Sequence, residues 1–329
     1  MKKKYLFAIC VSLLTCGCSQ TGRQADGGAD EPTDREKDST AVTSFVETVY
    51  KDVLSAYNKR GAEPDAGAFD KQYLSADFLM WQEELEKVAA KHPGEIVGPE
   101  GGDHWIQGQD WDLVGMQIDS LWFGQDQPAV FITINHSGNC VGSSHLQLLL
   151  SKDDTGNWRI DDFVSGASEK NLIKSCVAGE QIGVLYEMII KDCKRQTETR
   201  DYTSLDDFND LPYLTHEYHR LYQQVDSMDD ANRAEGGRFF NYDHWGLGQE
   251  FYSIEAATVS ECSIMDDGRA DVMLDLTVKA DYIRKPDTSH ESRRLFLKWE
   301  DGQWRVDDFV SPQGLSEKAL MKEYLQKKE

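Results

Sequence analysis

The sequence has few basic residues for the number of its acidic ones. Its 329 residues include 35 Lys and Arg against 58 Asp and Glu, so the formal net charge is −23 at pH 7. A surface this acidic repels phosphate backbones and anionic membranes. We therefore expect no nucleic-acid partner.

Cysteine pairs at metal-binding spacing and the common metal and phosphate motifs are also missing. Outside the cytoplasm disulfides are permitted, and the sequence leaves open the pairing state of four cysteines, which are Cys140, Cys176, Cys193 and Cys262. They form no Cys-x-x-Cys pair, and His216 and His219 lie three residues apart, whereas a zinc helix needs four. The turn at 266–271 lacks the ligand spacing of a calcium loop. The sequence predicts no metal and no cofactor, and it identifies no catalytic residue.

The apolar run at residues 5–14 is too short to span a bilayer. Three lysines precede it, and small residues lead from it to Cys18. This pattern predicts a bacterial lipoprotein signal peptide over residues 1–17, with Cys18 as the lipidated residue. Thr15 stands where such signals usually have Leu, so Cys16 is an alternative site and an ordinary secreted signal is an alternative interpretation.

Residues 19–40 contain no apolar residue larger than Ala or Pro. Such a segment cannot bury enough surface to offset its ordering entropy, so we predict a disordered tether over residues 18–41. Acyl chains on Cys18 anchor a protein to a membrane that its acidic surface would otherwise avoid. The expected location is the bacterial cell envelope, with the protein lipid-anchored to the outer membrane and facing either the periplasm or the exterior.

One block of ten residues occurs twice in the chain. Residues 156–165 read GNWRIDDFVS, and residues 302–311 read GQWRVDDFVS. A nearly unchanged block at this separation indicates two copies of one domain in tandem. Two copies are too few for a solenoid, which needs at least three shorter repeats.

Both copies show helical periodicity first and strand periodicity afterwards. Apolar residues recur at helical spacing over residues 42–57 and again over 182–193. Ser75 and Thr215 are predicted N-caps of a second helix in each copy. Alternating strands and their glycine turns are predicted at residues 113–122, 129–135, 146–150 and 158–164, then at 253–264, 270–280, 294–299 and 304–310.

Helices followed by antiparallel hairpins indicate an α+β fold. We predict two tandem cone domains, each with N-terminal helices packed on a curved antiparallel sheet. The predicted boundaries are 42–166 for the first cone, 167–181 for a linker helix, 182–312 for the second cone and 313–329 for a C-terminal helix.

This order, with a Gly-Gln-Asp-Trp box at 108–111 and a strand that reads Trp-Arg-Ile-Asp-Asp and then Trp-Arg-Val-Asp-Asp, resembles a known family. The family comprises bacterial lipoproteins of unknown function (domain of unknown function 3828) in the nuclear-transport-factor-two-like, or cystatin-like cone, group. The resemblance covers nearly all of residues 42–312, twice. It implies the cone fold but no reaction, because the wider group includes isomerases and dehydratases as well as plain binding domains.

A polar box occurs in both copies where a loop enters the sheet. Its candidate site residues are His104, Trp105, Gln109 and Asp110, then His244, Trp245, Gln249 and Glu250. A histidine at the mouth of a cone can act as an acid or base, since it titrates near neutrality. We favour the alternative, in which the aromatic rings fill the core and the polar groups bind loop amides, because both copies keep the box.

The repeated aspartate pairs are the second candidate. Phe163 breaks the apolar alternation of its strand, so either the strand bulges or one aspartate points inward. Asp162 and Asp308 are therefore candidate pocket carboxylates, because an inward carboxylate has a raised pKa and can exchange protons. The favoured alternative is a buried aspartate that caps a bulge, since an unpaired buried charge is costly.

Three functions remain after these exclusions. The first is a membrane-anchored envelope lipoprotein that acts as a non-catalytic binding or scaffolding module for an unknown protein, peptide or polymer ligand. The second is an acid–base enzyme of the isomerase or dehydratase type that uses the cone pocket, and the third is an inhibitor or immunity-type protein. A cone interior filled by apolar side chains argues against the enzyme, whereas a polar cavity at His104 or Asp162 argues for it.

Overall fold

The computed structural model describes most of the chain after residue 33. The described residues are 34–58, 65–95, 97–99, 103–107, 113–124, 127–136, 142–199, 211–231, 239, 244–245, 252–280 and 287–328. The predicted signal peptide and the predicted lipidation at Cys18 lie outside these residues. So do four members of the polar box, Gln109, Asp110, Gln249 and Glu250.

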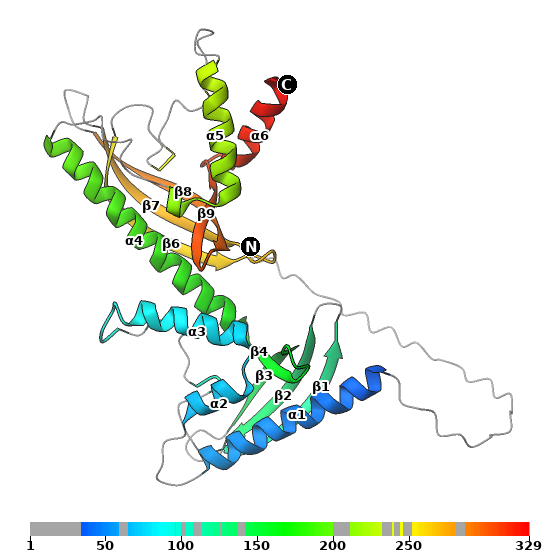
Figure 1. The fold of residues 1–329 in the computed structure, drawn as a ribbon. Coiled ribbons are helices and arrows are strands. Elements are labelled where there is room, and N and C mark those ends of the chain that lie inside the picture. Colours follow the sequence, from blue (N-terminus) through cyan, green and yellow to red (C-terminus); the bar gives the residue numbers. More distant parts are fainter. Residues whose placement is uncertain are drawn as a thin grey trace, which may run out of the picture. The chain divides into compact units, whose positions relative to one another are not determined.

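Three helices and an antiparallel sheet make up the first copy, which we call the first cone (Figure 1). The sheet has the strand order β1-β2-β3-β4-β5, so every strand pairs with its neighbour in sequence. The elements are α1 (Asp34–Tyr57), α2 (Ala66–Tyr73), α3 (Ala76–Ala89), β1 (Leu113–Phe123), β2 (Pro128–His136), β3 (Gly142–Lys152), β4 (Trp158–Ser165) and the two-residue β5 (Ala167–Ser168).

The second copy, called the second cone, repeats this order with a sheet of four strands, β6-β7-β8-β9. Its elements are α4 (Glu169–Thr199), the short 3-10 helix η2 (Leu211–Tyr213), α5 (His216–Ala231), β6 (Tyr252–Ile264), β7 (Ala270–Ala280), β8 (Asp287–Glu300), β9 (Gln303–Val310) and α6 (Glu317–Lys328). The predicted α+β class with two antiparallel sheets is confirmed. Within the described residues, no helix is both long and apolar enough to cross a membrane.

The last long strand of each cone, β4 in the first and β9 in the second, contains a bulge at the repeated aspartates. In the first cone Leu149 pairs with Asp162 but Leu150 pairs with Ile160, so one extra residue sits between these pairs. In the second cone the same shift occurs between Phe296 and Leu297. A bulge restores the inward alternation of apolar residues after the aspartates. The broken alternation that the sequence shows is therefore explained by a bulge.

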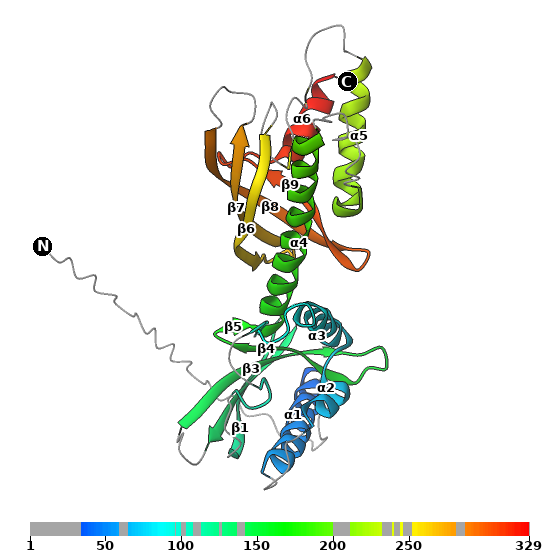
Figure 2. The ribbon, with the colours of Figure 1, turned by 90° about the vertical axis from the view of Figure 1, so that its left-hand side faces the viewer.

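The interior of the first cone is filled by apolar side chains. Valines of α1 at helical spacing, from Val42 to Val53, are fully buried. They belong to the same core as the inward residues of β2 and β3, such as Ile132 and Leu148. In the second cone α4 lies beside β6 (Figure 2) and buries Ile182 and Leu185. Close packing of this kind forms the hydrophobic core beneath the helices.

Two helices extend beyond the predicted boundaries. α1 begins at Asp34, inside the segment predicted as a tether, because Arg35, Glu36 and Lys37 are good helix formers next to the buried stripe. α4 runs from Glu169 to Thr199 without a break, so the predicted linker helix and the first helix of the second cone are one helix. Its N-terminal part contacts α3 and β4, and it also contacts β6 and β7.

A third helix, α2, was not predicted, because Gly61 and Gly67 indicated a break in the pattern. Asp65 starts it as the N-cap, with its Oδ1 accepting from Ala68 N at 3.1 Å. The predicted caps of the following helices are confirmed: Ser75 Oγ accepts from Phe78 N at 3.0 Å, and Thr215 makes the matching bond in the second cone.

Candidate binding site

The outer aspartate of the first pair, Asp161, joins two helices to the last strand. Its carboxylate accepts from Ser75 Oγ at 2.7 Å and from Lys170 Nζ at 2.7 Å. Lys170 also pairs with Asp77 at 2.9 Å, so the start of α3 is held to the start of α4. Burial alone raises the pKa of the Asp161 carboxyl, but Lys170 and Ser75 outweigh that effect, and the pKa is lowered.

Asp307 does the same in the second cone. It accepts from Thr215 Oγ1 at 2.9 Å and from Lys318 Nζ at 2.7 Å. Lys318 in turn pairs with Glu217 at 2.8 Å. Hydrogen bonds from Lys318 and Lys322 lower the pKa of Glu217 to about 2. The clamp of hydroxyl, aspartate and lysine is thus duplicated along with the fold.

The inner aspartate, Asp162, sits at the start of α4. Its Oδ1 accepts from Phe163 N at 2.9 Å and from Lys170 N at 2.9 Å, and its Oδ2 accepts from the Ser168 hydroxyl. Ser168 Oγ also accepts from Asn171 N at 3.0 Å, as an N-cap does. Burial raises the pKa of the Asp162 carboxyl more than these donors lower it.

Asp308 repeats these contacts at the start of α6. It accepts from Lys318 N at 2.9 Å and from the Ser316 hydroxyl. Burial likewise raises the pKa of Asp308. Because backbone and hydroxyl donors occupy both oxygens of each inner aspartate, the two residues hold a bulged strand to a helix N-terminus.

His104 lies between two carboxylates in the first cone. Its Nε2 is 3.1 Å from Asp70 Oδ1, and its Nδ1 is 3.3 Å from Glu169 Oε1. The ring is 12% exposed and packs on Phe163, with the ring centroids 4.6 Å apart. Burial lowers the pKa of His104, but the hydrogen bonds to Asp70 and Glu169 outweigh burial and raise the pKa to about 9. The imidazole is therefore a charged link between α2 and α4 at neutral pH.

Trp105 fills the core next to this histidine. It is fully buried, and its indole Nε1 donates to Asp70 Oδ1 at 2.8 Å. Asp103 Oδ1 accepts from Trp105 N at 2.8 Å and so fixes the turn. Gln107 closes the turn at φ 52, an unusual conformation for a residue with a side chain, and its Nε2 donates to His104 O at 3.1 Å.

The second box is built differently. His244 Nδ1 is 4.0 Å from Glu317 Oε1, and the Tyr218 hydroxyl donates to the same glutamate. Trp245 is buried against Phe309, with ring centroids 5.0 Å apart. The aromatic rings of the box thus have the predicted core position in both cones, whereas the polar contacts around them differ.

A buried arginine, Arg293, also distinguishes the second cone. Its Nη2 donates to His244 O, and its guanidinium lies 5.4 Å from the centre of the Phe309 ring. No carboxylate among the described residues forms an ion pair with it. The matching registers of β8 and β3 place it at the position of Leu146 in the first cone. The two interiors therefore differ in polarity.

A cavity of about 320 Å³ lies in the first cone, at the end where His104 sits. Its walls come from α2, α3, two loop segments, β4, β5 and α4. They are formed by Asp70, Gln82, Leu85, Glu86, Pro99, Gln107, Phe163, Ser165, Ala167, Glu169, Leu172 and Ile173. Both carboxylates that bind His104 are among them, and Asp162 is not.

The sequence did not single out the carboxylates of this cavity. Asp70 and Glu86 lie on helices far from the polar box in sequence, and no spacing relates them to it. Glu169 carried a signal, because the Ser-Glu-Lys at 168–170 returns at 316–318. That repeat marks the first residues of α4 and α6, where each glutamate approaches the histidine of its own box.

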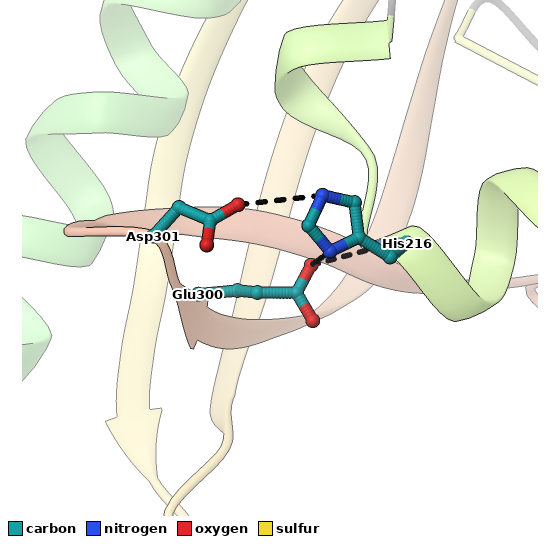
Figure 3. A group of neighbouring side chains, drawn as sticks. All are labelled: His216, Glu300 and Asp301. Atoms are coloured by element: carbon teal, nitrogen blue, oxygen red, sulfur yellow. Dashed lines mark hydrogen bonds and ion pairs between the residues drawn. The ribbon is translucent and has the colours of Figure 1, made fainter.

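One group of side chains has the composition of a metal site (Figure 3). His216 Nδ1 is 3.3 Å from Glu300 and Nε2 is 3.3 Å from Asp301. Arg305 Nη2 already pairs with Asp301 Oδ2 at 2.8 Å, so a guanidinium occupies the place where a cation would bind. His216 and Asp301 are also 69% and 54% exposed. The group is explained as a surface network of ion pairs.

Comparisons with known proteins give little further information. No protein-family model matches the chain, and no curated protein matches it. A solved structure of an "Ntf2 like protein involved in plasmid conjugation" is similar at 11% identity, over 83% of this chain and 98% of that one, with a TM-score of 0.21. So low a TM-score gives that neighbour no weight, and the fold class rests on the elements of this chain.

Proposed function

We propose that this protein is a membrane-anchored lipoprotein of the bacterial cell envelope whose two cones form a non-catalytic binding module. The lysines, short apolar run and small residues before Cys18 support the anchor. The order of helices and hairpins, together with the repeated boxes, supports placing both cones in the nuclear-transport-factor-two-like group. A doubled module also suits a protein, peptide or polymer with repeated features.

The observation behind the non-catalytic proposal is how the repeated polar residues are used. Asp162 and Asp308 have both oxygens occupied by helix amides and hydroxyls. Asp161 and Asp307 are paired with lysines of the following helix. Groups saturated in this way stabilise structure and have no free oxygen for a substrate. The polar residues that both copies keep therefore stabilise the fold.

The acid–base enzyme remains the second candidate, because Asp70, His104 and Glu169 meet at the cavity. A histidine that acts as a general base must be unprotonated at the working pH and must reach the proton it removes. His104 has a pKa raised to about 9, and each ring nitrogen already faces a carboxylate. These two facts favour binding over proton transfer.

The anchor is tested by replacing Cys18. We expect Cys18→Ala to move the protein from the membrane pellet to the soluble fraction, because the acyl chains are lost. Cys16→Ala is the matched control and should leave the protein in the pellet. Immunoblots of washed membranes provide the measurement. A Cys18→Ala protein that stays membrane-bound would refute lipidation at this residue.

The choice between binding and proton transfer is tested on the imidazole of His104. Its titration can be followed by nuclear magnetic resonance of ring nitrogens, with His104→Gln used for the assignment. A pKa near 9 is expected from the two carboxylates. A pKa below 7 would make the ring neutral in the cell and would favour the enzyme.

A further inference from the structure

The cavity of the first cone has walls of two kinds. One part is apolar and includes Leu85, Phe163 and Leu172. Leu172 is 45% exposed although it is a large apolar side chain on a packed helix. The glycine before Pro99, at φ 106, lies so close to Leu85 that an added Cβ would be 2.7 Å from its Cδ2. The loop at residues 97–99 therefore packs closely against α3, and Pro99 lies in the cavity wall.

Among the described lining residues, all charged side chains have one sign. They are Asp70, Glu86 and Glu169, and these described residues include no lysine or arginine. Two lysines of these helices pair with acids outside the lining. Lys170 pairs with Asp77 at the start of α3 and with Asp161 of β4, and Lys87 pairs with Glu84. Even with His104 charged, the cavity has an excess of negative charge.

Two of these carboxylates are only half satisfied. Asp70 gives its Oδ1 to His104 and Trp105, whereas its Oδ2 has one weak contact, from Gln82 at 3.5 Å. Glu169 gives its Oε1 to His104, and no described residue donates to its Oε2. Their side chains are 17% and 20% exposed. Because both side chains keep some exposure at the cavity, a ligand there can supply the donors that these two oxygens lack.

Glu86 adds a third negative group at the rim. It is exposed, and no described residue forms an ion pair with it. A volume of about 320 Å³ is at the small end for ligand sites. The space suits a small molecule or one side chain of a larger partner.

We propose that the cavity of the first cone binds an organic cation, with an alkylammonium head beside Asp70 and Glu169 and an apolar arm against Leu172. This inference rests on the proposed binding function and names its ligand chemistry. An ammonium group brings three donors to oxygens that lack them and a positive charge to an acidic wall. The head can belong to a free amine or to a lysine side chain of a peptide, which are two sources of the same chemistry.

The test uses the full chain carrying Cys18→Ala, which keeps detergent out of the titration. Isothermal titration calorimetry compares hexylamine with hexanol and hexanoate, which have the same arm with no charge or the opposite charge. We expect hexylamine to bind at least tenfold more tightly than either. Nα-acetyl-lysine N-methylamide, which has a free side-chain ammonium, then distinguishes the sources. Comparable binding indicates a peptide side chain, and much weaker binding indicates a free amine.

Two pairs of variants locate the ligand. Glu86→Gln should weaken hexylamine binding about threefold to tenfold, and Glu83→Gln, an exposed acid on the same helix outside the cavity, should leave it unchanged. Leu172→Lys should weaken it at least tenfold by placing a cation in the wall. Val184→Lys changes another exposed apolar residue of α4, 37% exposed, and is the control.

Three results would overturn the proposal. Hexanol or hexanoate binding as tightly as hexylamine would show a ligand cavity of different chemistry, and the proposed binding function would stand. Equal effects of Glu86→Gln and Glu83→Gln would place the amine elsewhere. No binding of hexylamine to chains that unfold cooperatively would mean that the cavity takes no such cation. Because all four substitutions are at exposed or rim positions, misfolding is not expected to confuse the result.

Discussion

The two cones hold their last strand to the next helix in the same way, but they use one glutamate differently. In the first cone Glu169 is 3.3 Å from His104 and 20% exposed at the cavity. In the second, Glu317 is 5% exposed and accepts a bond from the Tyr218 hydroxyl. Phe78 takes the position of Tyr218 in the first cone and has no hydroxyl to offer. The Tyr218 hydroxyl is thus one contact that Glu317 has and that Phe78 cannot offer to Glu169.

This difference indicates where to look for function in a duplicated protein. The aspartate clamps are retained in both copies because each cone needs them to attach its helices. The residues around the histidine have diverged, and so has the interior, where Arg293 replaces Leu146. Features common to both copies describe the fold, and features of one copy are candidates for a specific role.

The largest effect is expected from removing the inner aspartates. Asp162→Ala and Asp308→Ala each leave buried amide and hydroxyl donors without an acceptor, so each should lower the free energy of unfolding by about 3 kcal/mol. Asp154→Ala, in an exposed turn, is the control and should change it little. Denaturant unfolding gives the measurement. If one variant lowered the free energy of unfolding by less than a third as much as the other, the two inner aspartates would not be equivalent.

Alkaline pH should affect the first cone through His104. Its folded pKa is raised from 6.5 to about 9, so its stabilisation is complete below pH 6.5 and is lost as the pH rises through 9. The loss amounts to about 3 kcal/mol at most. The free energy of unfolding, measured between pH 6 and 10, should show this loss in the parent and in His244→Gln. The loss should be absent in His104→Gln. An unchanged slope in His104→Gln would disprove the assignment.

The smallest effect on stability is expected from removing the Tyr218 hydroxyl of the second cone. Tyr218→Phe removes a donor to the buried Glu317 and should cost about 2 kcal/mol of unfolding free energy. The reverse change, Phe78→Tyr, should bring a hydroxyl towards Glu169 and weaken hexylamine binding, and its fold is checked first because Phe78 is fully buried. Calorimetry and thermal unfolding of both variants check this. Stronger amine binding in Phe78→Tyr would contradict the comparison between the cones.

Much of the fold follows from local patterns, and much of the site does not. The strands and the caps at Ser75 and Thr215 were predicted because alternation and hydroxyl capping depend on near neighbours in sequence. β8 begins at Asp287, seven residues before its predicted start at Arg294, because the first half of this strand is polar and shows no apolar alternation. The pairing of His104 with Asp70 and Glu169 depends on the three-dimensional fold, which one sequence does not reveal.

The uninterrupted α4 has a consequence for what each half of the chain can be by itself. Its beginning supplies Glu169 to the cavity of the first cone, and its length packs on β6 of the second. α6 occupies the corresponding closing position of the second cone and starts with the same Ser-Glu-Lys. Duplication thus merged the last helix of one unit with the first helix of the next. The ancestral unit cannot be recovered by a single cut, and separating the halves would require this helix to be supplied twice.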